Sequence, residues 1–257
     1  MLKKTSFQVI YALRDRERID RIDALYCYRF DRSVDFELSG RLSVDLDLDR
    51  LLIQALKAPA TGERIPDFYH RLEDRPSAQA AVVRAWAGLM GPTRMDTMDA
   101  LVTDQLGRDA VRRTPRSTTR YARDGTRSVF PPAEQAAGWL DRIEAVERTR
   151  PHPFAMACFA YAQTVLSHPY QDGNGRLARA MYQRSLGRSG LLAGPLLPLG
   201  PLVYANHRVH DRALQHLGMT GDWDPFVEVM LGLTRKAAAF SRHVLSTQPA
   251  SACPDRD

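Results

Sequence analysis

Long apolar runs are absent from this sequence, although 44% of its 257 residues are hydrophobic. No stretch approaches the ~18 apolar residues that a membrane-spanning helix needs, so we expect no membrane partner. A short apolar stretch near the N-terminus ends at Arg14, and no small-residue cleavage site follows it. The sequence therefore predicts no signal peptide and a cytoplasmic protein, although delivery as an effector stays open.

Cysteine and lysine are scarce as well. Cys27, Cys158 and Cys253 are far apart and odd in number, which is typical of free thiols in a reducing compartment. This pattern argues against a disulfide framework or a zinc site. The basic residues are nearly all arginines, and the net charge is +6. An arginine-biased coding sequence explains this charge as well as nucleic-acid binding does, so we do not expect a nucleic-acid partner.

A Walker-type phosphate loop is also missing, because Gly-Lys-Ser/Thr occurs nowhere in the chain. The sequence instead holds a dense motif at 168–179, HPYQDGNGRLAR. The motif combines a histidine, a carboxylate, an amide, two glycines and two arginines directly after an apolar helical segment. A plain connection between two helices needs only a glycine and a cap, so this motif indicates a functional site.

Helical periodicity and helix-end signals dominate most of the chain. They predict helices over 48–56, 77–91, 93–106, 133–148, 154–167, 201–217 and 223–245. About sixteen further helical residues are expected after the motif, and they stop near Gly187 and Gly190. We therefore predict a mainly α fold. We divide the chain into an N-terminal region of unassigned role at 1–92, a catalytic core at 93–245 and a flexible tail at 246–257.

Two hairpins are expected beside these helices. Residues 34–38 and 42–48 alternate apolar and polar side chains around Ser39-Gly40, which predicts strands in the N-terminal region. The second hairpin, near 118–130, has Asp124-Gly125 between two short segments that are rich in β-formers. Two prolines at 131 and 132 end this hairpin and begin the next helix.

The glycines of the motif suit an anion site. Gly173 and Gly175 allow backbone angles that turn successive N–H groups to one side of a tight loop. The helix that follows adds the unpaired N–H groups and the positive dipole of its N-terminus. Together these groups predict a site for a di- or triphosphate.

The charged side chains of the motif fit the same substrate. Arg176 and Arg179 are three residues apart, so both lie on one face of the first helical turn, where guanidinium groups bind phosphate oxygens. Asp172 is the carboxylate of the loop and is a candidate to hold Mg²⁺ against those phosphates. Histidine titrates near neutral pH, so His168 is the candidate general base for a hydroxyl that attacks phosphorus.

The motif resembles the signature of the Fic family, His-Pro-Phe-x-Asp/Glu-Gly-Asn-Gly-Arg-x-x-Arg. Tyr170 departs from it, because the family has phenylalanine there. That ring packs in the core beneath the loop, so tyrosine needs a partner for its hydroxyl. The resemblance covers residues 95–245 and includes the hairpin near 118–130. It implies a Fic-type helical core with a β-hairpin flap, preceded by a small N-terminal region with strands.

The resemblance implies an enzyme, a protein adenylyltransferase that moves AMP from the co-substrate ATP onto a hydroxyl of a target protein. By this resemblance, His168 would deprotonate the hydroxyl and Asp172 would hold Mg²⁺. The other motif residues would bind the nucleotide. Gly173, Asn174 and Gly175 would hold its α- and β-phosphates. Arg176 and Arg179 would hold its terminal phosphates. A target segment would dock on the hairpin near 118–130 as an added strand.

The chemistry and its control have alternatives. Gly175 favours nucleotidyl transfer, since the branch of the family that phosphorylates has lysine there, and transfer of UMP, GMP or phosphocholine stays open. Many Fic proteins carry, or receive from a partner, a Ser/Thr-x-x-x-Glu-Gly/Asn helix whose glutamate pairs with the second motif arginine. The nearest match, at 33–37, is followed by Leu38 and has a strand pattern. We therefore expect restraint, if any, from a separate inhibitory partner, from assembly or from the N-terminal region in another way.

Functions outside this enzyme class are also considered. Seven arginines within 108–127 motivate a non-catalytic nucleic-acid-binding or adaptor protein on a Fic fold, but no motif residue is missing, which disfavours it. His207, His210 and His216 are candidates for a metal site, although their spacing is ordinary for a helix. Asn206 and His210 are candidates to line the nucleotide pocket, or to lie on a helix surface.

Overall fold

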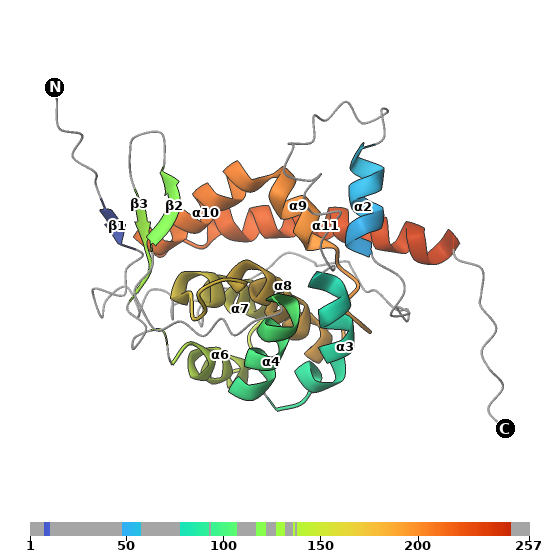
Figure 1. Cartoon of the computed structure of the whole chain (residues 1–257), viewed down its shortest axis with the longest axis horizontal. Helices are drawn as coiled ribbons and strands as arrows, with labels where there is room; N and C mark the ends of the chain where they lie inside the picture. The colour runs from blue at the N-terminus through green and yellow to red at the C-terminus, as the bar shows by residue number, and fades with distance from the viewer. Residues whose placement is uncertain are drawn as a thin grey trace.

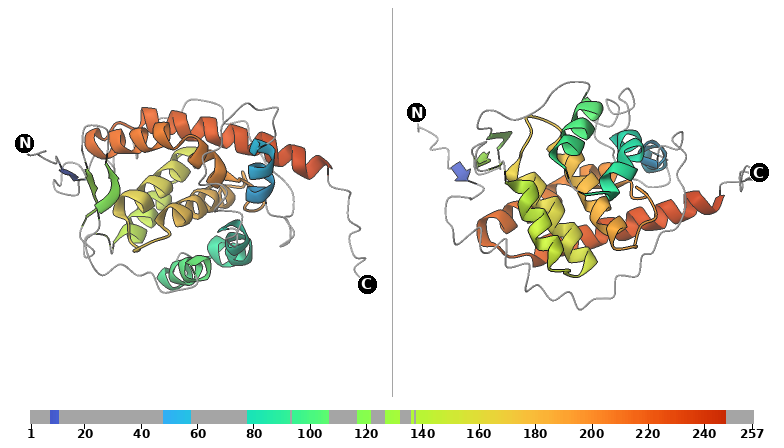
Figure 2. Two further views of the ribbon diagram at one scale, coloured as in Figure 1. Left: turned by 45° about the horizontal axis from the view of Figure 1, so that its top comes forward. Right: turned by 90° about the horizontal axis from the view of Figure 1, so that it is seen from below.

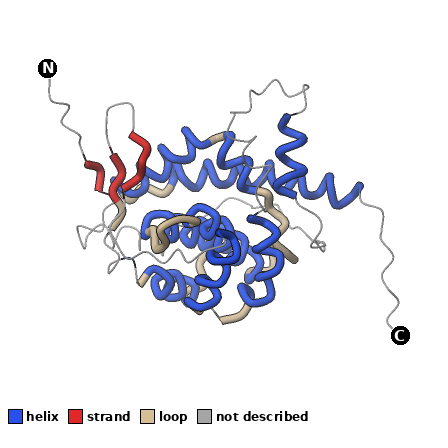
Figure 3. The backbone as a smooth tube through the Cα atoms, in the orientation of Figure 1, coloured by secondary structure: helices blue, strands red, loops and turns tan. Residues whose placement is uncertain are grey.

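The computed structural model describes residues 8–10, 48–57, 78–92, 94–106, 117–121, 127–131, 136 and 138–247, which are mainly helical (Figure 1, Figure 3). The mainly α fold that the sequence predicts is therefore confirmed. In chain order the elements are β1 Gln8–Ile10, α2 Leu48–Lys57, α3 Ala78–Met90, α4 Met95–Leu106, β2 Ser117–Tyr121, β3 Arg127–Val129, α6 Trp139–Arg148, α7 Pro153–Ser167, α8 Asn174–Arg188, α9 Leu199–Ala205, α10 His207–Thr220 and α11 Asp224–Thr247.

Two helices, α7 and α8, form the centre of the molecule. They pack against each other, and helices from other parts of the chain cover them on both sides (Figure 2). On one side α3 and α4 lie against α8, whereas on the other side α11 lies against α7 and packs with α9 and α10. The core therefore surrounds the connection from α7 to α8, which is the segment that carries the motif of residues 168–179.

The burial of α7 follows from its sequence, PFAMACFAYAQTVLS. A helix that is apolar on nearly every side is stable in the interior of a protein. Pro153 occupies the first helical turn, and His152 Nδ1 accepts a hydrogen bond from the Phe154 N–H at 3.2 Å, as an N-cap does. Burial lowers the pKa of His152, which favours the neutral ring that can accept this bond.

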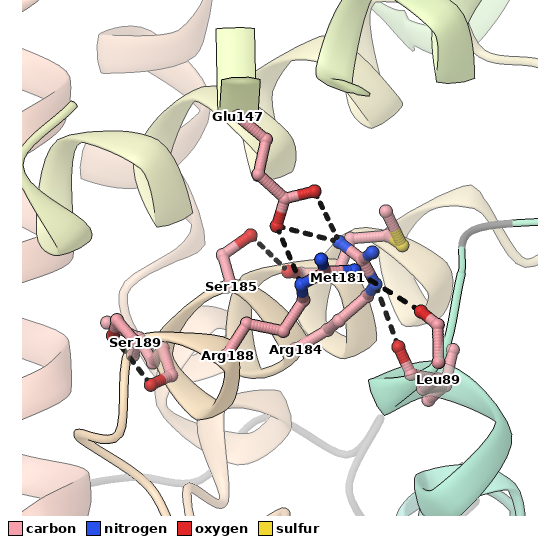
Figure 4. A network of polar contacts seen from close by, with 9 residues as sticks. Leu89, Glu147, Met181, Arg184, Ser185, Arg188 and Ser189 are labelled. Carbon is pink, nitrogen blue, oxygen red and sulfur yellow. Dashed lines mark hydrogen bonds and ion pairs between the residues drawn. The ribbon is translucent and has the colours of Figure 1, made fainter. Parts of the chain in front are cut away.

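A buried arginine fixes the C-terminal half of α8 (Figure 4). Arg184 is fully buried, and its Nε donates to the Leu89 carbonyl at 2.9 Å. Its Nη1 lies 3.4 Å from both carboxylate oxygens of Glu147, and Arg188 Nε lies 3.1 Å from the same carboxylate. Arg188 also donates to the Gly91 carbonyl at 3.2 Å. The two arginines thus join α3, α6 and α8, and they satisfy carbonyls at the C-terminal end of α3.

The predicted hairpin near 118–130 is present. β2 and β3 pair antiparallel, with Ser117 opposite Val129 and Tyr121 opposite Arg127, and the register shifts between these two pairs. β1 pairs with the other side of β3 and runs parallel to it. The hairpin is therefore part of a three-stranded sheet with β3 in the middle, at one end of the molecule (Figure 1).

One predicted helix is two helices in the structure. The sequence predicts a helix over 201–217, but α9 ends at Ala205 and α10 begins at His207. Between them, Asn206 donates to the Leu202 carbonyl with both its backbone N–H and its side-chain Nδ2, at 3.0 and 2.8 Å. An asparagine side chain that bonds to the backbone in this way competes with the helix. The prediction of one continuous helix is wrong for this reason.

Most other helices begin and end within about two residues of their predicted limits, which is the usual uncertainty of a helix end. This holds for α2, α3, α4, α7 and α11. Helix α8 ends near the predicted Gly187, but it begins at Asn174, inside the motif rather than after it. The helix expected over 133–148 is described as α6 from Trp139 onward, after a turn at Gly138.

Several predictions fall outside the described residues. These are the N-terminal hairpin at 34–48, the turn at Asp124-Gly125 and the tail beyond residue 247. The division of the chain at residue 92 stays a prediction, and two helices before it pack on later ones, α2 on α9 and α3 on α4 and α8. Among the described residues, no helix combines the length and the apolar character that crossing a bilayer requires.

Candidate active site

The loop between α7 and α8 is closed by an asparagine. The Tyr170 N–H donates to Asn174 Oδ1 at 2.9 Å, and Asn174 Nδ2 donates back to the Tyr170 carbonyl at 2.7 Å. Asn174 is buried, so both bonds are shielded from water. The motif asparagine therefore holds the loop with its side chain, and its predicted contact with phosphate stays a prediction.

Gly173 precedes α8 in a conformation that favours glycine, with φ 83°. A Cβ atom there would lie 3.4 Å from a methyl group of Val102 and 3.4 Å from one of Leu106, both on α4. Any other residue would therefore be strained by this backbone conformation, and its Cβ atom would contact α4. Gly175 is exposed, and a Cβ atom there would lie 3.5 Å from Arg179 Nη1. A side chain at position 175 would thus contact the second motif arginine.

The first turn of α8 offers backbone N–H groups to a ligand. The first backbone bond of this helix runs from the Leu177 N–H to the Gly173 carbonyl, at 2.9 Å. The N–H groups of Asn174, Gly175 and Arg176 come before it, and such groups have no acceptor within their own helix. The helix dipole adds a positive potential at the same end, so the geometry favours an anion here.

Both motif arginines line one narrow pocket beside α8. Arg176, Arg179, Gln183 of α8, Asp49 of α2 and Gly200 of α9 all face it. Two guanidinium groups make the pocket suitable for phosphate oxygens. Asp49 Oδ2 and Arg179 Nε lie 3.2 and 3.6 Å from the point that a Cβ atom at Gly200 would occupy. A carboxylate of α2 therefore lies beside the arginine that is predicted to bind the terminal phosphates.

Asp172 lies on the exposed side of the loop, with half of its side-chain surface accessible. Its Oδ1 accepts a bond from the Gly173 N–H at 2.7 Å and lies 3.7 Å from Arg176 Nη2. Arg176 Nη1 donates to the Gln105 carbonyl of α4 at 3.2 Å, which orients this guanidinium. An accessible carboxylate beside a phosphate site fits Mg²⁺, which is commonly bound by one or two carboxylates together with substrate phosphates and waters.

Tyr170, the departure from the Fic signature, has a partner for its hydroxyl. The ring is buried, and its hydroxyl donates to Asp99 Oδ1 of α4 at 2.5 Å. Burial and the contact with Asp99 raise the pKa of Tyr170 well above its usual value, so the hydroxyl stays protonated and can donate. The loop is thereby joined to α4 by a polar bond that phenylalanine cannot make.

His168 ends α7 in a left-handed conformation, with φ 50° and ψ 54°, and its N–H donates to the Thr164 carbonyl at 3.1 Å. For a residue other than glycine this conformation costs roughly 1–2 kcal/mol. Its imidazole stacks on the ring of Phe130, with centroids 3.7 Å apart and planes 12° apart. Strained residues of this kind are frequent at functional sites, and here the strain falls on the candidate base.

Tyr161 of α7 lies close to Arg179. Burial raises the pKa of Tyr161 to about 12, although the nearby Arg179 guanidinium opposes part of this rise. The Tyr161 ring packs edge to face on His210, with centroids 5.5 Å apart. Neither Asn206 nor His210 is among the described residues that line the pocket of Arg176 and Arg179.

The three histidines of α10 do not come together. His207 Nδ1 contacts the Tyr204 carbonyl at 2.9 Å, whereas His216 Nε2 contacts Asp222 Oδ2 at 2.9 Å and lowers the pKa of that carboxyl. His210 is buried. In the part of the chain that the structure describes, no three His, Cys, Asp or Glu side chains gather around a metal position. The structure gives no support to a metal site at these histidines.

Sequence reasoning missed three residues of the site. Asp49 has the position of an ordinary acidic residue in a first helical turn, and Asp99 that of an ordinary polar residue on α4. Their contacts with the site join distant parts of the chain, which no local pattern reveals. Phe130 carried a weak signal, because it is the last residue of the predicted hairpin and directly precedes the two prolines.

The fold and the site define a helical protein with a glycine-rich loop at the start of a central helix. Residues 95–186 match the model of the Fic/DOC family, so this part of the chain is a Fic domain. A Fic domain indicates a transferase.

Two solved structures show the same fold. A Fic family protein from Desulfovibrio desulfuricans G20 matches with a TM-score of 0.52 and 19% identity, over 91% of this chain and 75% of that one. A Fic domain containing signaling protein from Bacteroides thetaiotaomicron matches with a TM-score of 0.52 and 15% identity, over 93% of this chain and 94% of that one. The similarity therefore extends beyond the Fic domain to most of the chain.

Proposed function

We propose that this protein transfers AMP from Mg²⁺–ATP onto a hydroxyl of a target protein. The observation that carries the proposal is the closed loop that has His168 at one end and the N-terminus of α8 at the other. Arg176 and Arg179 line a pocket on the α8 side of this loop. This arrangement supports a reaction in which α8 binds the phosphates while the end of α7 deprotonates a hydroxyl.

In the proposed reaction, neutral His168 accepts the proton of the target hydroxyl on a ring nitrogen. The target oxygen attacks the α-phosphorus of ATP and forms a P–O bond. The bond from the α-phosphorus to the oxygen that bridges it to the β-phosphorus breaks, and pyrophosphate leaves with the bond electrons. Arg176 and Arg179 neutralise charge on the leaving phosphates. When bound at Asp172, Mg²⁺ would supply further charge neutralisation.

The target would dock on the sheet that contains the hairpin. An extended segment can extend a sheet at an unpaired edge. Because β3 lies between β1 and β2, a target strand has the outer edge of β1 or β2, or else the place of β1 itself. We favour replacement of β1, because the central strand β3 is followed directly by Phe130, whose ring stacks on His168.

Control by a separate inhibitory partner remains part of this proposal. The nearest match to the family's inhibitory sequence, residues 33–38, lies outside the described residues. The carboxylate that the structure does show beside Arg179 is that of Asp49. A partner that covers the pocket of Arg176 and Arg179 would prevent the phosphates of ATP from binding there. This holds whichever segment of this chain lies beside the pocket.

Transfer of UMP, GMP or phosphocholine is the second candidate chemistry. The described residues that line the arginine pocket include no aromatic side chain on which a base could stack. The two guanidinium groups of the pocket support binding of phosphates, and the described lining residues give no reason to prefer one nucleotide over another.

Label transfer tests the proposal. The full chain is incubated with Mg²⁺ and a cell lysate, and separately alone, with ATP, UTP or GTP labelled at the α-phosphate or with CDP-choline labelled in phosphocholine. ATP labelled at the γ-phosphate is the matched control. We expect protein labelling from α-labelled ATP and none from γ-labelled ATP. Label from the γ-phosphate alone would indicate a kinase, and no label from any donor would favour the non-catalytic adaptor.

A further inference from the structure

An aromatic ring from the hairpin side lies flat on the candidate base. Phe130 and His168 stack with centroids 3.7 Å apart and planes only 12° from parallel. Phe130 is 7% exposed, and it is the first residue after β3. The hairpin therefore reaches the end of α7 through this contact.

We propose that Phe130 is a positioning residue for His168. Its ring fixes the plane of the imidazole, and the hairpin thereby controls the direction in which the base accepts a proton. The inference rests on the proposed function, in which His168 deprotonates the target hydroxyl.

The backbone of His168 is held by other contacts. Its N–H bonds to Thr164, and the preceding Ser167 hydroxyl lies 2.6 Å from the Gln163 amide and 3.3 Å from Arg142 Nη2. These contacts set the place of the His168 Cα atom, but they do not set the rotation of the ring. The terminal torsion of histidine is broad, so the plane of the imidazole depends on what packs against it.

A phenyl ring stacked parallel to the imidazole is compatible with both the neutral and the protonated state of His168. The ring nitrogens of histidine and their lone pairs lie in the imidazole plane, so a ring stacked on the face leaves their directions clear. After proton transfer, the imidazolium lies over the negative face of the Phe130 ring, which attracts a cation. A leucine of similar bulk would fill the space but would provide neither a flat face nor this attraction.

The position of Phe130 also links target docking to the base. On one side the residue continues β3, and on the other side Pro131 and Pro132 restrict the backbone. A movement of β3 when a target strand is added would therefore move the ring that lies on His168. Docking and orientation of the base are coupled through one side chain.

A spectroscopic experiment tests the contact without reference to activity. In histidine-labelled protein, the ring protons of His168 are those that disappear in His168→Ala. A phenyl ring stacked on the imidazole shifts these protons upfield. We expect the shift to be lost in Phe130→Leu and kept in Phe130→Tyr. Unchanged His168 shifts in Phe130→Leu would overturn the inference.

Kinetics test the role of the contact. In Phe130→Leu we expect kcat for label transfer to fall by about tenfold or more, while KM for Mg²⁺–ATP stays within about twofold. Phe130→Tyr keeps the flat ring and should stay within about threefold of the wild type. The matched control is Phe154→Leu, which shortens a fully buried phenylalanine at the opposite end of α7. It should lower the thermal midpoint but not kcat.

The outcomes separate the two proposals. No transfer by the wild type from any labelled donor would overturn the proposed function, and this inference with it. Transfer that requires His168 but is equally fast in wild type and Phe130→Leu would overturn the inference alone. If Phe130→Leu does not fold, Phe130→Met provides a flexible apolar side chain without a ring, and the same expectations apply.

Discussion

The two halves of α8 use arginine in different ways. Near the start of the helix, Arg176 and Arg179 line a pocket. Near its end, Arg184 is fully buried, and Glu147 binds both Arg184 and Arg188. Desolvation lowers the pKa of Arg184, and Glu147 opposes this effect. Under the proposed function, the same residue type binds a ligand at one end of the helix and stabilises the fold at the other.

The partners supplied by the fold make this difference. At the end of α8, a carboxylate of α6 and carbonyls at the end of α3 satisfy the guanidinium groups. At its start, Arg176 donates to the Gln105 carbonyl and lies near Asp172, and Asp49 lies near Arg179. Both guanidinium groups nevertheless line a pocket, in which we propose that an anion binds. Arginines near the motif should thus affect ligand binding, and those beyond it should affect stability.

Arg184→Met removes the buried guanidinium group near the C-terminal end of α8 and should have the largest effect on stability. Removal of one partner of a buried ion pair costs about 3–5 kcal/mol, because Glu147 and the Leu89 carbonyl lose a donor. The free energy of unfolding is measured by denaturant titration. Arg188→Met is the matched control, since Arg188 is partly exposed and should cost about 1 kcal/mol or less. Equal losses in the two variants would contradict the central role of Arg184.

Arg179→Ala removes a guanidinium group near the start of α8, where we propose that the phosphates bind. We expect the affinity for Mg²⁺–ATP to fall by about tenfold to a hundredfold, as for loss of a charged hydrogen bond of 1.5–3 kcal/mol. The free energy of unfolding should change little. Calorimetry checks the affinity and denaturant titration the stability. Unchanged affinity together with a large loss of stability would mean that Arg179, like Arg184, stabilises the fold and does not bind the ligand.

Asp49→Asn sharpens the comparison, because it removes the nearby negative charge but keeps the size of the side chain. We expect the affinity for Mg²⁺–ATP to rise by about two- to fivefold, as for removal of an interaction near 0.5–1 kcal/mol. Calorimetry at low and high salt checks this, and the gain should shrink at high salt. A fall in affinity would instead assign Asp49 a supporting role in the pocket.

The smallest effect concerns the start of α7, where His152 accepts a bond only when it is neutral. Its pKa is lowered by burial, so its contribution to stability is present above pH ~6.5 and is lost as the pH falls below that value. We expect His152→Asn, which keeps a cap that does not titrate, to remove about 1 kcal/mol or less of this pH dependence. Unfolding titrations of both proteins at pH 7.5 and 5.5 check it. Equal pH dependence of the unfolding free energy in the two proteins would contradict the role of neutral His152 as the N-cap of α7.

Local sequence was enough for the elements that carry the motif. The apolar run of α7 predicted a helix, and Asp-Gly between β-forming segments predicted the hairpin. The break at Asn206 could not be predicted from periodicity, because it depends on a side chain that bonds to its own backbone. Local capping bonds of this kind leave the apolar pattern unchanged.

The site was predictable as far as the motif extends. The contact of the Tyr170 hydroxyl with Asp99 spans 71 positions, and that of Phe130 with His168 joins two different elements. Such contacts arise from packing, which a local pattern does not encode. A sequence motif can therefore indicate the chemistry of a site, whereas the residues that orient it come from the fold.

The most direct test of the account compares wild type with His168→Ala in two measurements, label transfer from α-labelled ATP and Mg²⁺–ATP affinity by calorimetry. The account predicts that the variant loses transfer by at least about a hundredfold, as for loss of a general base, while its affinity stays within about twofold. This result would separate the base at the end of α7 from the phosphate site at the start of α8. Transfer within a few-fold of wild type in His168→Ala would contradict the account.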